Sequence, residues 1–221
     1  MRALQLIAAA ILTCLPAPAG AFPSAQGQPG RIVDRIVARI EGDIILLSQV
    51  RELGAFQELV EGHAENDERL LTELIEQWMV QTEASASYFP PPAQSEVDRE
   101  MARLQSQFAS PEAYAARLRT LGLAVSEARQ LLSRQIYLER YLDYKFRPTV
   151  QIESSDVEAY YQKELLPELA QKQQPAPPLA DVEAQIREVL TQREISDRAA
   201  KWLDDTKSRL KIEVSLPGAA S

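Results

Sequence analysis

The chain has 221 residues, of which 45% are hydrophobic and 25% are charged, and its formal net charge is -8. This composition is typical of a globular protein with one or two domains and a hydrophobic core. The acidic balance argues against a nucleic-acid partner, because binding phosphates requires a basic surface.

The first 21 residues have the pattern of a cleavable export signal. Arg2 supplies a positive start, and residues 3–15 form an apolar stretch that is too short to span a membrane. Two prolines and the small residues Ala19-Gly20-Ala21 follow, so we predict cleavage after Ala21. A lipid anchor at Cys14 fits less well, because bulky residues precede that cysteine. No later stretch is apolar for about 18 residues, so we expect a soluble periplasmic product without a transmembrane segment.

Two strands around a tight turn are predicted next, after a flexible leader over residues 22–30. Apolar and polar residues alternate over residues 32–40, and a second short strand is expected over residues 43–47. Gly42 provides the backbone freedom that the turn between them requires. A hairpin alone is marginally stable in water, so this one requires a further strand.

Amphipathic helices are predicted between the hairpin and Pro167, because apolar residues recur there at helical spacing. Gly62 and Gly122 are expected to end two of these helices, and Pro148 a third. The residues expected to cap or begin the helices are Ser48, Glu68, Ser95, Ser110, Ser126 and Ser155.

The C-terminal part is predicted to complete the same folded unit. A Pro- and Gln-rich linker over residues 171–180 leads to a long helix that Asp181 is expected to cap. Leu210, Ile212 and Val214 then alternate with charged residues, as in a strand. We therefore predict a mainly helical α+β fold with a small antiparallel sheet of hairpin and C-terminal strand. This folded unit would comprise residues 31–170 and 181–216.

Residues for catalysis or metal binding are scarce in this sequence. The single histidine, His63, lies in a polar stretch between helices, where a solvated loop residue is the simpler interpretation. The sequence contains no nucleophile motif, no glycine-rich phosphate loop and no cluster with metal-ligand spacing. We expect neither an enzyme nor a cofactor or metal.

Apolar and aromatic side chains are the remaining candidates for function. They would form either the core or an adaptable surface for varied apolar partners, to which methionine and aromatic residues are suited. The candidate client-binding residues are Trp78, Met79, Met101, Phe108, Tyr114 and Leu118.

The order of these elements resembles the SurA family of periplasmic chaperones. The stretch DRIVARIEGDIILLSQVRE is similar to the family's opening hairpin and first helix, and LLTELIEQWMVQTEASAS to its second helix. The stretch from SEVDREMARL to SSDVEAYY is similar to the remaining helices of its N-terminal domain. REISDRAAKWLDDTKSRLKIEV resembles its C-terminal helix and closing strand. The resemblance implies ATP-independent binding of unfolded polypeptides, especially outer-membrane proteins, in an apolar cradle.

One departure from the family bears on activity. SurA-like proteins usually carry parvulin prolyl-isomerase domains where this chain has only residues 171–180, and a domain needs about 50 residues. We therefore expect no isomerase activity. An isomerase-related protein and a dedicated assembly or scaffold subunit for one specific partner remain alternatives. The linker would also permit a homodimer that exchanges the C-terminal segment.

Overall fold

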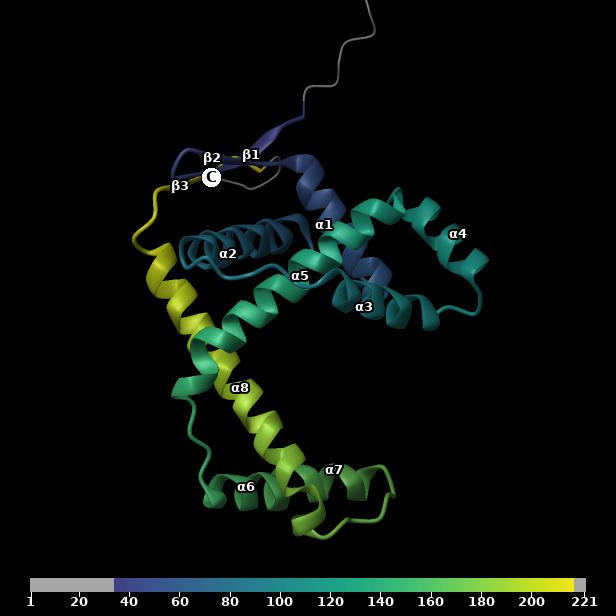
Figure 1. Ribbon diagram of the computed structural model, residues 1–221, viewed down its shortest axis with the longest axis vertical. Helices are drawn as coiled ribbons and strands as arrows, with labels where there is room; N and C mark the ends of the chain where they lie inside the picture. Colours follow the sequence, from purple (N-terminus) through teal and green to yellow (C-terminus); the bar gives the residue numbers. More distant parts are fainter. Residues whose placement is uncertain (1–33, 217–221) are drawn as a thin grey trace, which may run out of the picture. The chain divides into compact units, whose positions relative to one another are not determined.

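A three-stranded antiparallel sheet joins the two ends of the part of the chain that the computed structural model describes, residues 34–216 (Figure 1). Its strands are β1 (Ile36–Ile40), β2 (Asp43–Leu46) and β3 (Ile212–Val214), in the order β2-β1-β3. β1 pairs with β3 in a register that places Ala38 opposite Val214 and Ile40 opposite Ile212. The prediction that the hairpin pairs with a C-terminal strand is therefore confirmed.

Hydrogen bonds beyond the strands extend this junction at both ends. At one end, the Lys211 N–H donates to the Glu41 carboxylate at 2.7 Å, and the Glu41 N–H donates to the Lys211 carbonyl at 3.3 Å. At the other end, Ser215 donates its backbone N–H to the Val37 carbonyl and its hydroxyl to the Ile36 carbonyl. Further hydrogen bonds therefore flank the pairing of β1 with β3 at both of its ends.

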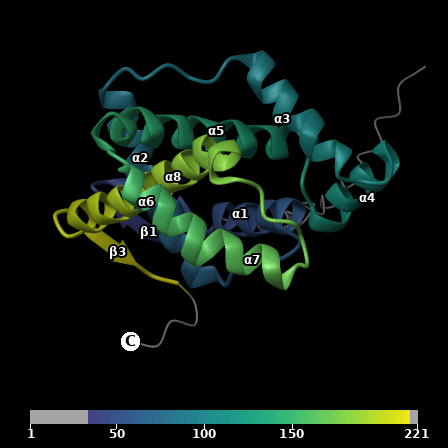
Figure 2. The ribbon, with the colours of Figure 1, turned by 90° about the horizontal axis from the view of Figure 1, so that it is seen from below.

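Helices make up most of the remainder, so the mainly helical α+β class is confirmed (Figure 2). The α-helices are α1 (Leu47–Val60), α2 (Asp67–Ala86), α3 (Gln94–Ser106), α4 (Pro111–Leu121), α5 (Val125–Phe146), α6 (Ser154–Tyr160), α7 (Leu166–Gln171) and α8 (Leu179–Lys207). A 3-10 turn, η1 (Arg147–Thr149), follows α5, and a π-helical turn, η2 (Tyr161–Leu165), joins α6 to α7.

Two of the predicted helix boundaries are confirmed by their local geometry. The Ser110 side chain accepts a hydrogen bond from the Ala113 N–H, as an N-cap does, and Pro111 occupies the first helical position. Gly122 ends α4 with φ of 69°, a left-handed conformation that glycine adopts without strain.

Several predicted caps are wrong. Ser48, Ser95 and Ser155 lie inside α1, α3 and α6, because each helix begins one residue earlier. Asp181 likewise lies within α8, which begins at Leu179 after Pro178.

A residue before the sheet caps α1 in place of Ser48. The Asp34 carboxylate accepts the Ser48 N–H at 3.2 Å, fourteen positions away in sequence. Hydrogen bonding with Ser48, through its side chain first and also through its backbone N–H, lowers the pKa of Asp34. The negative charge at the helix N-terminus is also favoured by the helix dipole.

Pro167 does not end the helix in which it lies, contrary to expectation. Proline has no N–H to donate, and its ring collides with the carbonyl four residues earlier in a regular helix. The chain widens into η2 just before it, where the Leu166 N–H donates to the Tyr161 carbonyl five positions back. The wider turn lets the helical path continue to Gln171, so the predicted linker shortens to residues 172–178.

The buried side chains form separate clusters along the molecule. The first lies between the sheet and the start of α1 and α2, the second among α1, α3, α4 and α5, and the third between α2 and α5. Trp202 and Leu203 of α8 pack against the third cluster, which links α8 to the helices before it.

The predicted export signal and leader, residues 1–30, lie outside the described residues. Within residues 34–216, no helix combines the length and hydrophobicity required to cross a bilayer.

Candidate functional site

The six predicted client-binding residues fall into two separate clusters. Met79 is buried in the cluster beneath the sheet, and the half-buried Trp78 packs against it. Met101, Tyr114 and Leu118 are buried in the cluster among α1, α3, α4 and α5. Phe108 packs against that second cluster.

Most of these side chains are occupied with packing in this structure. Met79, Met101, Tyr114 and Leu118 are each at most 5% exposed. The Phe108 ring meets the Tyr114 ring edge-on, with their centroids 5.2 Å apart. These contacts stabilise the fold, and Phe108 and Tyr114 also line an open cavity beside α3 and α4.

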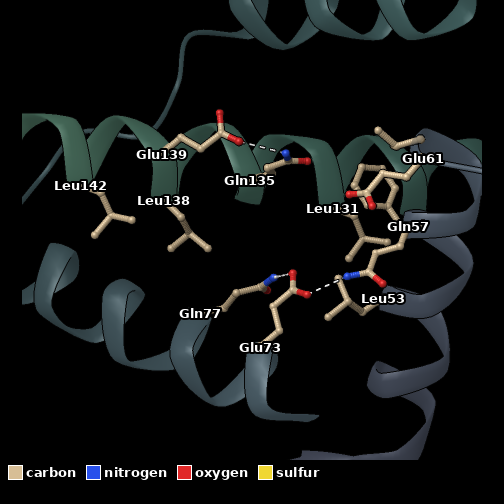
Figure 3. A pocket seen from close by; sticks show the side chains of 12 residues that line it. Leu53, Gln57, Glu61, Glu73, Gln77, Leu131, Gln135, Leu138, Glu139 and Leu142 are labelled. Carbon is tan, nitrogen blue, oxygen red and sulfur yellow. Dashed lines mark hydrogen bonds between the residues drawn. The ribbon is translucent and has the colours of Figure 1, made fainter. Parts of the chain in front are cut away.

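An open cavity of about 260 Å³ lies where α1, α2 and α5 meet (Figure 3). Six apolar side chains, three from α1 and three from α5, form part of its wall. They are Leu53, Phe56, Val60, Leu131, Leu138 and Leu142. Figure 3 shows Leu138 and Leu142 pointing from α5 toward α2.

The rest of the wall consists of carboxylates and amides. These residues are Gln57, Glu61, Glu73, Gln77, Gln135 and Glu139. The wall therefore carries three carboxylates and neither lysine nor arginine.

Glu73 is at the centre of this polar set. Its carboxylate points from α2 toward α5 and accepts one amide N–H on each oxygen (Figure 3). The donors are Gln57 of α1, at 2.7 Å, and Gln77, one turn further along α2, at 3.0 Å. The Gln57 amide oxygen in turn accepts the Glu65 N–H, which fixes the orientation of the Gln57 side chain.

The electrostatic environment of Glu73 is unfavourable to its charge. Burial raises the pKa of Glu73, and the negative charges of Glu61 and Glu76 add to this, while the hydrogen bonds from Gln77 and Gln57 oppose it. Within residues 34–216, Glu73 has no Lys, Arg or His partner at ion-pair distance. Its charge is thus partly desolvated and not balanced by a cation.

A signal for this cavity was present in the sequence of α5. Leu131, Leu138 and Leu142 are spaced by seven and four residues, which places them on one face of a helix. Leu132 and Ile136 lie on a different face of α5 and pack in the second cluster, which Leu131 also contacts. A helix with two apolar faces must contact two layers or leave one face partly open. The polar half of the wall carries no comparable sequence pattern.

The wall of the cavity combines apolar side chains with amide and carboxylate groups. Its wall contains no Ser, Thr, Cys, His or Lys that could serve as a nucleophile. Elsewhere in residues 34–216, no group of three or more potential metal ligands is present. No protein-family model and no curated protein matches this chain significantly. Function is therefore inferred from the residues and their geometry.

Proposed function

We propose that this protein is an ATP-independent periplasmic chaperone that holds unfolded or outer-membrane-bound client polypeptides. The observation that carries the proposal is the open cavity between α1, α2 and α5, whose wall combines six apolar side chains with amide and carboxylate groups. Supporting it is the sheet in which β3 pairs with β1, the closure that the SurA-like order of elements implies.

The size of the cavity favours a polypeptide over a free small molecule. Pockets for small ligands usually measure about 300–1,000 Å³ and enclose most of the ligand. A cavity of about 260 Å³ that is open to solvent suits one or two side chains of a longer chain. Binding would bury an apolar side chain of the client against the leucines. Gln77 and Gln135 would form hydrogen bonds with polar groups of the client.

Such a site fits a holding activity. Unfolded outer-membrane proteins expose apolar side chains and unpaired strand edges, through which they aggregate. A partly open apolar site with adaptable polar groups binds many sequences weakly and releases them without an energy source.

The test is to dilute an unfolded outer-membrane protein into buffer with and without the purified chain and to record aggregation by light scattering. Delayed aggregation without ATP is expected, and an unchanged time course would overturn the proposal. Leu131 and Leu132 provide a matched pair of variants, because both are half-buried and pack against the second cluster, but only Leu131 lines the cavity. Leu131→Ser should reduce the delay more than Leu132→Ser, with circular dichroism confirming that both are folded.

Two further measurements separate the alternatives. Acceleration of cis/trans exchange in an X-Pro peptide would indicate an isomerase. Isolation of one stoichiometric partner, in place of many clients, would indicate a dedicated assembly or scaffold subunit.

A further inference from the structure

The cavity between α1, α2 and α5 has a negatively charged part of its wall as well as an apolar part. Burying a carboxylate is unfavourable unless hydrogen bonds or an opposite charge compensate for it. Glu73 has two amide donors, but a carboxylate has about four acceptor positions. Capacity therefore remains on its two oxygens.

Neighbouring groups increase the negative potential at this position. Glu61 shares the cavity wall with Glu73, and its one ion-pair contact is with His63 at 3.8 Å, in which both side chains are more than half exposed. Glu139 of α5 also lines the cavity and accepts the Gln135 amide at 2.9 Å. The charges that the wall presents are therefore all negative.

Resting on the proposed chaperone function, we propose that the cavity selects client segments in which an apolar side chain lies next to a lysine or arginine. The apolar side chain would pack on Leu131 and Leu142, and the neighbouring cation would reach the free acceptor positions of Glu73. The opposite charge would compensate a carboxylate that the empty site leaves unbalanced. The occupant is thus an extended or helical basic-apolar segment, and acidic segments are disfavoured by repulsion.

The two glutamines have a positioning role in this arrangement. By donating to one oxygen each, Gln57 and Gln77 hold the Glu73 carboxylate in a fixed orientation between α1 and α2. A carboxylate that is already oriented loses less side-chain entropy on binding a cation than a freely rotating one.

The binding test uses a fluorescein-labelled peptide, Gly-Ser-Lys-Leu-Lys-Phe-Lys-Gly-Ser, and a second peptide with glutamine in place of each lysine. Fluorescence anisotropy with the full chain should show binding of the lysine peptide that is about tenfold tighter, the size of one well-placed charge contact. Equal affinity for the two peptides would overturn the proposal.

Two charge variants locate the effect. Glu73→Gln should abolish most of the preference for lysine. Glu76→Gln is the matched control, because Glu76 lies one turn away on α2, is also half-buried with its pKa raised by burial, and does not line the cavity. Retention of the preference in Glu73→Gln, or equal loss in both variants, would contradict the assignment to this cavity.

A photo-crosslinking measurement tests the location while leaving Glu73 and the leucines of the wall in place. Gln135 is exposed at the wall, and Gln107 is an exposed glutamine after α3 that does not line the cavity. A benzophenone side chain at position 135 should capture the lysine peptide, whereas one at position 107 should not. Equal capture at both positions would overturn the assignment.

Light scattering with the same variants separates this inference from the proposed function. If the wild-type chain delays aggregation but binds the two peptides equally, the basic-apolar selectivity is wrong and the proposed function stands; if Glu73→Gln keeps the preference, the assignment of the selectivity to this cavity is wrong. If the peptide preference is found but aggregation is not delayed, the binding site stands and the chaperone function is wrong.

Discussion

Trp78 of α2 donates its indole N–H to the carboxylate of Asp43 in β2, at 2.9 Å. The two residues are 35 positions apart, and Asp43 is also the first residue after the hairpin turn. This contact attaches the sheet to α2 at its open edge, while Trp78 packs its ring against the cluster below.

Loss of this hydrogen bond should weaken the attachment of the hairpin. Asp43→Ala is expected to lower the free energy of unfolding by about 0.5–1.5 kcal/mol, as for one hydrogen bond. Asp43→Asn retains an acceptor oxygen and should lose less. Urea unfolding followed by Trp fluorescence measures both, and equal losses for the two variants would show that the bond contributes nothing.

The pairing of β3 with β1 makes a prediction about two neighbouring side chains. Ile212 is half-buried against the cluster below the sheet, whereas Val214 is 54% exposed. Ile212→Ala should lower the free energy of unfolding by about 1–2 kcal/mol, because it removes apolar contacts at a partly buried position. Val214→Ala should stay within about 0.5 kcal/mol. Similar values for the two variants in urea unfolding would contradict the observed packing of β3.

The unbalanced charge of Glu73 should reduce stability at neutral pH. The folded-state pKa of Glu73 is raised above its unfolded value, so the folded protein binds the extra proton more tightly. The wild-type chain therefore loses stability, relative to Glu73→Gln, as pH rises from the unfolded value of about 4.3 through the folded pKa. Glu73→Gln should melt a degree or two higher at pH 7, on the order of a few tenths of a kcal/mol. The difference should disappear near pH 4 in thermal unfolding followed by circular dichroism. A lower melting temperature for the variant at pH 7 would show that Glu73 stabilises the fold.

An ion pair connects the end of α5 to α8. The two terminal nitrogens of Arg147 donate to the two carboxylate oxygens of Glu188, at 3.0 and 2.8 Å, and Arg147 also binds Asp143. Its guanidinium lowers the pKa of Glu188 to about 2, so the pair contributes stability above the unfolded glutamate pKa and loses it as pH falls toward 2.

Solvent screening limits the size of this contribution, because the Glu188 side chain is 54% exposed. Glu188→Gln should lower the free energy of unfolding by less than about 1 kcal/mol at pH 7 and low salt. The loss should shrink in 1 M NaCl, because the charges are then screened over a few Å. Glu183→Gln, which interrupts a pair within α8 alone, is the control. An unchanged loss at high salt would contradict an electrostatic origin.

The elements of the fold were predictable because each has a local periodic signal. Alternating apolar residues around Gly42 and again at Ile212 and Val214 predicted all three strands, and the lack of other strands left only one sheet to form. The helix caps were less predictable, since Asp34 caps α1 from the far side of the hairpin. The helical path through Pro167 depends on a π-helical turn for which the sequence gives no simple sign.

The spacing of the α5 leucines was the one sequence signal for the candidate site, and it did not show which apolar residues line an opening. An apolar side chain at helical spacing has the same pattern whether it packs in a core or lines an opening, so Met79 and Leu118 could not be distinguished from Leu131 by spacing. That distinction depends on how α1, α2 and α5 meet. Glu73 and Gln57 come together only when α1 packs on α2.

The junction of β1 with β3 also has a kinetic consequence. Its hydrogen bonds join residues 170 to 179 positions apart, so the sheet is complete only after a loop of that length has closed. Closing so long a loop carries an entropic penalty that local helix formation does not, and such contacts slow folding. Until β3 arrives, one edge of β1 is an unpaired template onto which a second chain could add its own strand. The time before β3 pairs with β1 is therefore the interval in which this protein is itself most prone to aggregate.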